Sequence, residues 1–217
     1  MTPGKFIVIE GIDGAGSSTQ SALLVQHLRA RGELVLATKE PTAGPAGALI
    51  RLALDKRLRG PNRSYHGAVA DTGSDDAFDV RALALLFAAD RMDHVHAIVE
   101  PALTQGRWVV CDRYVLSSLA YQGMELGVEW VAEINRFALK PDLTLYLDAP
   151  VEATQARMTA SRLTAERYES AGEQHSVREG YRTAIPHYEK LFGAVGRVEA
   201  ADAAAVVAER VRRLLDL

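Results

Sequence analysis

Gly11-Ile-Asp-Gly-Ala-Gly-Ser-Ser-Thr19 is the stretch of this 217-residue chain that decides its fold. An apolar run at residues 6–9 precedes it, and a helix-like segment at residues 21–30 follows it. This strand, glycine loop and helix form the context of a phosphate-binding loop, and Gly11 and Gly16 have the spacing of the pattern G-x-x-x-x-G-K-[ST]. Ser17 stands where that pattern has lysine. The chain therefore has the backbone cradle without its usual cation.

The bulk composition excludes several classes of protein. A net charge of −3 disfavours a broad nucleic-acid surface. The chain has no run of about 18 apolar residues, so we expect no membrane span. Cys111 is the sole cysteine, which excludes an intrachain disulfide and fits a reducing cytoplasm. We interpret it as a buried strand thiol rather than a nucleophile, and we expect one domain over residues 1–217.

Short apolar runs alternate with helical patterns along the chain. We expect strands at residues 5–10, 33–39, 108–112, 143–148 and 197–200, and further helices at 80–104, 129–139, 151–160, 175–191 and 203–217. This alternation predicts an α/β fold of the doubly wound type, with a five-stranded parallel sheet flanked by helices. Pro186 predicts a kink or break in the helix at 175–191. Residues 59–79 are rich in turn-forming residues and predict a long surface loop.

The glycine loop can bind phosphate through its backbone alone. Glycine leaves N–H groups free to converge on an anion, and the N-terminus of the following helix adds positive potential. Ser18 occupies the position of the hydroxyl that binds Mg²⁺ in such loops, and Thr19 follows it. The alternative is a glycine turn that binds nothing. The preceding strand, the two glycines and the hydroxyl argue against that alternative.

The absent lysine needs a substitute if the chain transfers phosphoryl groups. A cation near the β- and γ-phosphates offsets the charge that develops during transfer. Arg157, Arg162 and Arg167 cluster just after the strand expected at 143–148. A solvated basic face is the plainer interpretation of such a cluster. The missing lysine favours a lid at residues 157–170 that supplies the charge.

A second group of residues suits a nucleobase and a phosphate. Phe87 and Arg91 are four residues apart on one face of a helix, where a ring can stack on a base and a guanidinium can donate hydrogen bonds to it. A core phenylalanine beside an exposed arginine is the alternative. Asp112 and Arg113 end the strand expected at 108–112, and ligands bind at the carboxyl ends of strands in open α/β sheets.

These segments together resemble the thymidylate kinase family, in order and over nearly the whole chain. The matching stretches are Phe6-Ile-Val-Ile-Glu-Gly-Ile-Asp-Gly-Ala-Gly16, Glu40-Pro-Thr…Gly47…Ile50-Arg51, Leu86-Phe-Ala-Ala-Asp-Arg91, Asp112-Arg-Tyr…Ser117-Ser…Ala120-Tyr-Gln-Gly123, Lys140-Pro-Asp-Leu-Thr-Leu-Tyr-Leu-Asp148, Glu166-Arg-Tyr-Glu169 and Val177-Arg-Glu-Gly-Tyr181. The glycine loop alone indicates nucleotide binding. The block from Asp112 to Gly123 is far more specific.

The resemblance implies transfer of the γ-phosphoryl group of ATP to dTMP, with Mg²⁺, in a cytoplasmic homodimer. It implies ATP contacts from Gly11, Asp13, Gly14, Ala15, Gly16, Ser17, Ser18, Thr19 and Arg157. It implies dTMP contacts from Asp13, Lys39, Glu40, Pro41, Arg51, Phe87, Arg91, Arg113, Ser117, Tyr121 and Gln122. The catalytic residues that it implies are Asp112, Arg113, Arg157, Arg162 and Arg167.

Individual roles follow from the matched positions. Phe87 would stack on thymine, and Arg91 would donate to an exocyclic oxygen of the base. Arg113 would hold the dTMP phosphate, and Tyr121 would pack against the deoxyribose and disfavour a 2′-hydroxyl. The remaining expected roles belong to Ser117 and Gln122 in the base pocket, Asp13 near the sugar, Ser18 on Mg²⁺, and Asp112 on Mg²⁺ through water.

The chain departs from the family pattern at named positions. Ser17 replaces the loop lysine, Lys39 replaces the arginine before Glu-Pro, and Glu166 replaces a lid aspartate. Gly14-Ala15 carries no basic residue, a feature that in this family accompanies catalytic arginines in the lid. Two alternatives stay open: a kinase for another nucleoside or nucleoside monophosphate, and a nucleotide-binding pseudoenzyme, which Ser17 suggests.

Overall fold

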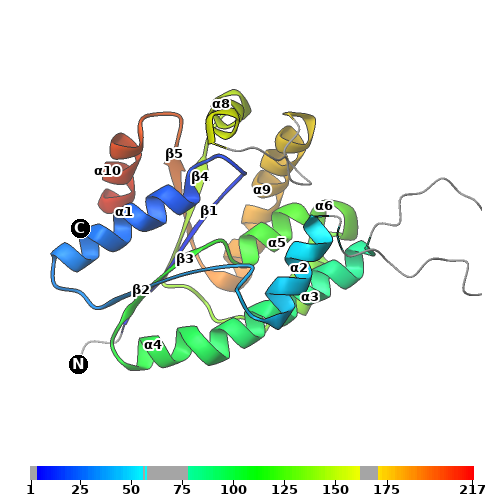
Figure 1. The fold of residues 1–217 in the computed structure, drawn as a ribbon, viewed down its shortest axis with the longest axis horizontal. Helices are drawn as coiled ribbons and strands as arrows, with labels where there is room; N and C mark the ends of the chain where they lie inside the picture. The colour runs from blue at the N-terminus through cyan, green and yellow to red at the C-terminus, as the bar shows by residue number, and fades with distance from the viewer. Residues whose placement is uncertain (1–3, 56, 58–77, 162–170) are drawn as a thin grey trace, which may run out of the picture.

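The computed structural model describes residues 4–55, 57, 78–161 and 171–217. Within those ranges the strands form one parallel sheet in the order β2-β3-β1-β4-β5 (Figure 1). Its members are β1 (Phe6–Gly11), β2 (Val35–Lys39), β3 (Trp108–Asp112), β4 (Leu143–Asp148) and β5 (Val195–Glu199). In register, Ile9 of β1 stands beside Asp112 of β3 and Leu145 of β4. The predicted parallel sheet is confirmed.

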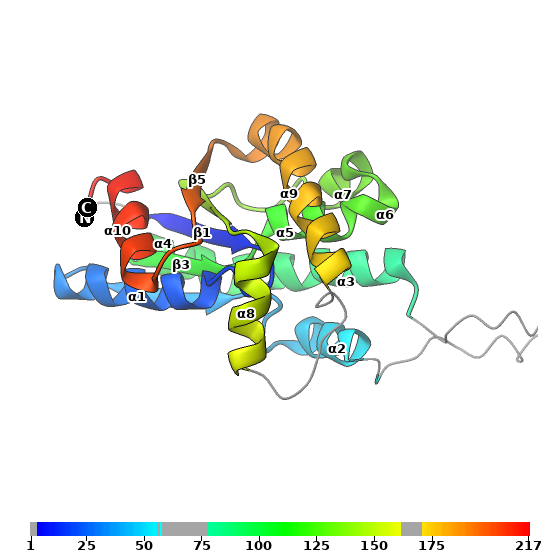
Figure 2. The same ribbon diagram turned by 90° about the horizontal axis from the view of Figure 1, so that it is seen from above.

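Helices connect the strands and cover both faces of the sheet. They are α1 (Ser17–Ala30), α2 (Pro45–Leu54), α3 (Val80–His94), the π-helical turn η2 (Val95–Val99), α4 (Glu100–Thr104), α5 (Val115–Tyr121), α6 (Gly123–Leu126), α7 (Val128–Ile134), α8 (Val151–Ser161), α9 (Ala171–Phe192) and α10 (Ala204–Leu214). Helix α1 packs beside α10, and α5 packs beside α9 (Figures 1 and 2). Right-handed crossovers explain why helices lie on both faces of the sheet. The chain moves toward one edge of the sheet from β1 to β2 and toward the opposite edge from β3 to β5.

The winding direction reverses between β1 and β3, which are neighbours in the sheet. The glycine loop leaves the carboxyl end of β1, and Arg113 leaves the carboxyl end of β3. Loops that diverge at such a reversal leave a crevice in which α/β proteins bind ligands. The fold therefore brings the two predicted halves of the site to one edge of the sheet.

The central strands are buried on both faces, which explains why they are nearly continuous apolar runs. Phe6, Ile7, Val8 and Ile9 of β1 are each at most 1% exposed. Cys111 lies fully buried in β3 as a free thiol, and burial raises its pKa well above the ordinary value. This agrees with the predicted structural thiol.

The predicted strands at 108–112 and 143–148 match β3 and β4 residue for residue. The helical run predicted over 80–104 forms as α3, η2 and α4 in succession. Of the kink or break predicted at Pro186, the break is wrong, because α9 continues through this residue. Burial of Tyr181, Ala184 and Tyr188 holds this helix together and outweighs the hydrogen bond that proline cannot donate.

Two predicted segments lie largely outside the described residues. The lid expected at 157–170 continues beyond residue 161, and nearly all of the loop expected at 59–79 is likewise not described. The last residue of that loop, Asp79, caps α3 by accepting hydrogen bonds from the backbone N–H groups of Arg81 (2.9 Å) and Ala82 (3.1 Å). Among the helices that are described, none is both long and apolar enough to cross a bilayer.

Candidate active site

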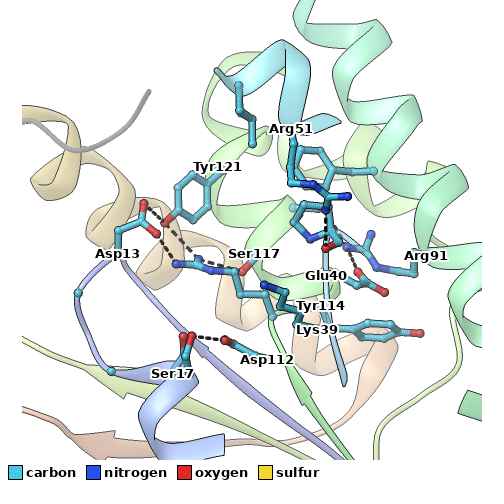
Figure 3. Close-up of a pocket in the computed structure, with 18 of the residues that line it drawn as sticks. Asp13, Ser17, Lys39, Glu40, Arg51, Arg91, Asp112, Tyr114, Ser117 and Tyr121 are labelled. Atoms are coloured by element: carbon cyan, nitrogen blue, oxygen red, sulfur yellow. Dashed lines mark hydrogen bonds and ion pairs between the residues drawn. The ribbon is translucent and has the colours of Figure 1, made fainter. Parts of the chain in front are cut away.

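A cavity of about 640 Å³ opens at the edge of the sheet where β1, β2 and β3 end (Figure 3). This volume lies within the range of small-molecule sites. Its lining comprises Asp13, Gly14, Gly16, Ser17, Ser18, Thr19, Lys39, Glu40, Pro41, Arg51, Leu54, Phe87, Arg91, Asp112, Arg113, Tyr114, Ser117, Ser118, Tyr121, Gln122, Arg157 and Met158. Almost all of the predicted contacts thus share one cavity.

The glycine loop forms one wall through its backbone. Gly14 and Gly16 have φ angles of 78° and 99°, a conformation that glycine adopts without strain. At Gly14 a side chain would also clash, since a Cβ would lie 2.7 Å from the carbonyl oxygen of Thr154. Ser17 begins α1 and is buried, whereas the next two side chains are exposed. The loop therefore presents helix N–H groups and hydroxyls in place of an ammonium.

Ser18 and Asp112 meet at the mouth of this loop. The Ser18 hydroxyl donates to Oδ2 of Asp112 at 2.5 Å. The other carboxylate oxygen of Asp112 is buried and has no hydrogen-bond partner among the residues that the structure describes. A buried carboxylate oxygen without a partner is costly and fits a cation ligand. The described residues contain no cluster of three or more acidic, histidine or cysteine side chains, so a metal ion here would need phosphate or water ligands as well.

Arg157 of α8 lies against the back of the loop. Its guanidinium donates to the carbonyl oxygens of Gly14 and Ala15, both at 3.4 Å. It also donates to the carbonyl oxygens of Ala200 and Ala201 at 2.9 Å, and thereby ties the loop to the segment after β5. In this arrangement Arg157 supports the loop. Stabilisation of phosphate charge by its guanidinium stays a prediction.

Arg113 stands at the centre of the cavity with φ at 69°, a left-handed value that non-glycine residues adopt rarely. Its guanidinium pairs with Asp13 at 2.5 Å and donates to the carbonyl oxygen of Gly11 at 2.9 Å. It donates to the Tyr121 hydroxyl at 3.2 Å and lies over that ring. Burial lowers the pKa of Arg113, but its neighbours, led by Tyr121 and Asp13, together outweigh burial and the net shift is upward. The group is a fixed cation between the loop and α5.

Arg91 is buried at the far end of the cavity and its guanidinium is held on several sides. It pairs with Glu40 at 2.8 Å, and it donates to the side chains of Asn135 and of Ser118, the latter at 3.2 Å. His94 holds the other oxygen of Glu40 at 2.9 Å. Phe87 lines the cavity beside this group. A ring and an oriented guanidinium suit a flat ligand with a hydrogen-bond acceptor at its edge.

Two further cations line the region between these arginines. Arg51 of α2 donates to the carbonyl oxygens of Pro41 (3.3 Å) and Thr42 (2.6 Å) and so fixes the segment after β2. Lys39 ends β2 beside Asp112 of β3. Among the cationic side chains that line the cavity, that of Lys39 alone has no hydrogen bond or ion pair with any residue that the structure describes. Its ammonium is available to an anion.

The structure brings most of the predicted site residues to this one cavity, and their contacts with ligands stay predictions. Gly11 and Ala15 lie behind the cavity and contribute backbone only, and Arg162 and Arg167 lie outside the described residues. Sequence reasoning assigned no role to six residues that hold the site in place, namely Glu10, His94, Tyr114, Ser118, Asn135 and Tyr181. The available signals were Glu10 as a charged residue inside an apolar strand, and the family-like stretches that contain Tyr114, Ser118 and Tyr181.

Comparisons with known proteins agree with this geometry. A family model described as thymidylate kinase matches residues 9–195. A Treponema pallidum protein assigned as a thymidylate kinase is 39% identical over 95% of this chain and 92% of its own length. A thymidylate kinase of Desulfotalea psychrophila is 42% identical over 74% of this chain and 71% of its own. The thymidylate kinase structure from Candida albicans superposes with a TM-score of 0.77 at 24% identity, over 99% of this chain and 92% of that one, which supports the fold.

Proposed function

The chain belongs to the thymidylate kinase family, enzymes that phosphorylate dTMP, and we propose that it performs this transfer inside the single cavity described above. One observation carries the proposal. The phosphate loop, the Asp13–Arg113 pair and the Glu40–Arg91 pair all border that cavity. The cavity therefore offers adjacent binding positions for a donor triphosphate, an acceptor phosphate and a base.

On the donor side, the loop backbone from Gly11 to Thr19 would bind the ATP phosphates. The free N–H groups at the start of α1 and the positive end of its dipole suit phosphate and need no lysine. Arg157 supports this assignment indirectly, because it fixes the loop from behind.

Ser18 and Asp112 would hold Mg²⁺, directly and through water respectively. The carboxylate oxygen of Asp112 without a partner in the described part of the chain and the adjacent hydroxyl are oxygen ligands of the kind that this ion prefers. When bound, the ion would neutralise charge on the donor phosphates. The protein's own part is to keep these oxygens at the mouth of the loop.

On the acceptor side, Arg113 and Lys39 would hold the dTMP phosphate between them. Lys39 has no competing partner within the described residues, which suits such a role. Tyr121, held by Arg113, would lie against the deoxyribose and leave no room for a 2′-hydroxyl. Arg91 and Phe87 would bind thymine at the far end, with Ser117 and Gln122 along the pocket.

The transfer itself needs positive charge rather than a strong base. The acceptor phosphate is already ionised, so positioning and electrostatic stabilisation are the main contributions. The loop carries no lysine, and we propose that the lid arginines Arg157, Arg162 and Arg167 supply charge to the transferring group. Closure of such a lid would also exclude water and limit hydrolysis of ATP.

We also propose a homodimer in a reducing cytoplasm. Leu85, Ala89 and Met92 are exposed and follow one another at i, i+4 and i+7 on α3, which makes a continuous apolar stripe. Leu85 is 50% exposed and Met92 is 44% exposed. A second copy packed on this stripe would bury it, on the helix that also carries Arg91 toward the acceptor end.

An assay of ADP release tests the proposed reaction. The wild-type protein is supplied with ATP, with and without Mg²⁺, and with dTMP, dUMP, dCMP, dGMP or dAMP as acceptor. We expect the highest kcat/KM with dTMP and no turnover after the metal is removed. Preference for another acceptor would favour the alternative nucleotide kinase. ATP binding without ADP release from any acceptor would favour the pseudoenzyme.

A further inference from the structure

Tyr181 of α9 belongs to a sequence motif, Val177-Arg-Glu-Gly-Tyr181, to which the proposed reaction gives no task. The side chain is fully buried and does not line the cavity. Its hydroxyl nevertheless lies directly behind the site. It is 3.0 Å from the carbonyl oxygen of Gly11, 2.8 Å from Oγ of Ser117 and 3.2 Å from a carboxylate oxygen of Glu10.

The carbonyl oxygen of Gly11 is the point where three elements meet. Arg113 donates to it from the start of α5 at 2.9 Å, and Tyr181 donates to it from α9 at 3.0 Å. Both lone pairs of this oxygen, the last of β1 before the glycine loop, are therefore used. Because the Ser117 hydroxyl donates to Glu10, the single proton of Tyr181 is shared between the carbonyl oxygen of Gly11 and Oγ of Ser117.

Glu10 completes the arrangement from β1. Its carboxylate is fully buried and accepts from the backbone N–H groups of Tyr114 at 2.8 Å and Ser117 at 3.2 Å. These N–H groups belong to the start of α5, directly after the left-handed backbone of Arg113. Burial raises the pKa of Glu10, and the donors around it and Arg113 oppose that rise. The carboxylate fixes the backbone from which Arg113 projects.

The position of Tyr181 is itself determined by close packing. Its ring stacks on Tyr146 with centroids 4.9 Å apart and meets Tyr121 edge-on at 6.1 Å. At Gly180 a Cβ would lie 2.4 Å from the carbonyl oxygen of Ala120, so α9 and α5 approach as closely as backbones allow. The hydroxyl therefore has little freedom to move away from Gly11.

We propose that Tyr181 is a positioning residue for phosphoryl transfer, which acts by fixing Arg113 against the first carbonyl of the phosphate loop. The proposal rests on the role of Arg113 as the acceptor-phosphate ligand. Tyr181 does not touch substrate. Its hydroxyl sets the spacing between the donor loop and the acceptor arginine, and misplacement of about 1 Å at such a distance costs large factors in rate.

The same helix offers a matched control. Tyr188 is also fully buried on α9, and its hydroxyl makes one hydrogen bond within the described residues, to Thr144 at 2.7 Å, away from the cavity. Tyr181→Phe and Tyr188→Phe each delete one buried hydroxyl and leave the ring in place. Steady-state kinetics with ATP and dTMP, together with melting temperatures, separate positioning from simple loss of stability.

For Tyr181→Phe we expect kcat/KM for dTMP to fall about tenfold or more, with the KM for ATP within about twofold of wild type. For Tyr188→Phe we expect kcat/KM for dTMP and the KM for ATP to stay within about twofold of wild type. Equal kinetics in the two variants would overturn the proposal. If Tyr181→Phe does not fold, Glu10→Gln is assayed by the same criterion. Absence of wild-type turnover with dTMP would instead refute the proposed function.

Discussion

In the proposed acceptor half of the cavity, Arg91 and Arg113 each form an ion pair with a carboxylate, at 2.8 Å and 2.5 Å. At the donor end, the loop offers backbone N–H groups, the Ser18 hydroxyl and a neighbouring carboxylate, but no lysine. Side-chain ion pairs thus fix one half, and backbone conformation fixes the other.

Under the proposed function, this difference would distinguish the two substrates. Recognition of a particular base needs oriented donors, and the buried partners of Arg91 hold its donating guanidinium in one orientation. Recognition of a triphosphate needs only convergent N–H groups and positive potential. The positive charge that phosphoryl transfer requires has to come from residues outside the phosphate loop. Substitutions on either side can test whether the halves are as independent as the geometry indicates.

The largest effect should follow loss of the buried guanidinium of Arg91. Arg91→Met leaves the carboxylate of Glu40 without its ion-pair partner, and we expect a loss of about 3–5 kcal/mol in the free energy of unfolding, measured with urea. The double variant with Glu40→Gln should recover part of that loss. Arg136→Ala, which breaks an exposed pair with Glu133, should change stability little. A similar small change for Arg91→Met would contradict the assignment.

The donor half is tested through the lid. We expect Arg162→Ala or Arg167→Ala to lower kcat about 100-fold, the effect of removing one group that stabilises transition-state charge. Arg213→Ala on α10, which removes an exposed surface cation paired with Glu209, should leave kcat unchanged. An unchanged kcat in both lid variants would mean that another cation serves the transferring group. Ser17→Lys, in either lid variant, should restore part of the lost rate.

The smallest effect on activity should come from the apolar stripe. Met92→Glu places a charge on the proposed contact between two copies, so we expect sedimentation velocity to show monomers. Because Met92 is next to Arg91 on α3, kcat/KM for dTMP should fall by a few-fold while the KM for ATP stays constant. Leu34→Glu adds the same charge at a more exposed position outside the stripe and should leave the dimer intact. A dimer in both variants would place the interface elsewhere.

Local sequence patterns were sufficient for much of this molecule. The β3 and β4 strands followed from apolar runs, and Asp112 and Arg113 followed from the rule that ligands bind at strand ends. The pairing of Phe87 with Arg91 followed from helical spacing and from resemblance to the family. These features depend on neighbours a few residues apart, where spacing alone determines which side chains share a face.

The supporting residues could not be predicted in this way. His94, Asn135 and Tyr181 contact the site from helices that are distant in the sequence, so only the fold brings them to Glu40, Arg91 and Gly11. The error at Pro186 has a related cause. Local chemistry predicts a break there, but packing of the whole helix against α5 decides the outcome.

The enclosure of Arg91 has a consequence for the design of inhibitors. A ligand that accepts a hydrogen bond from this guanidinium does not need to immobilise it, and ordering a flexible side chain on binding costs roughly 0.5–1.5 kcal/mol. Small fragments with a flat ring and one well-placed carbonyl should therefore bind the acceptor end with high affinity per atom. Compounds aimed at the phosphate loop would compete for backbone groups that every triphosphate also uses.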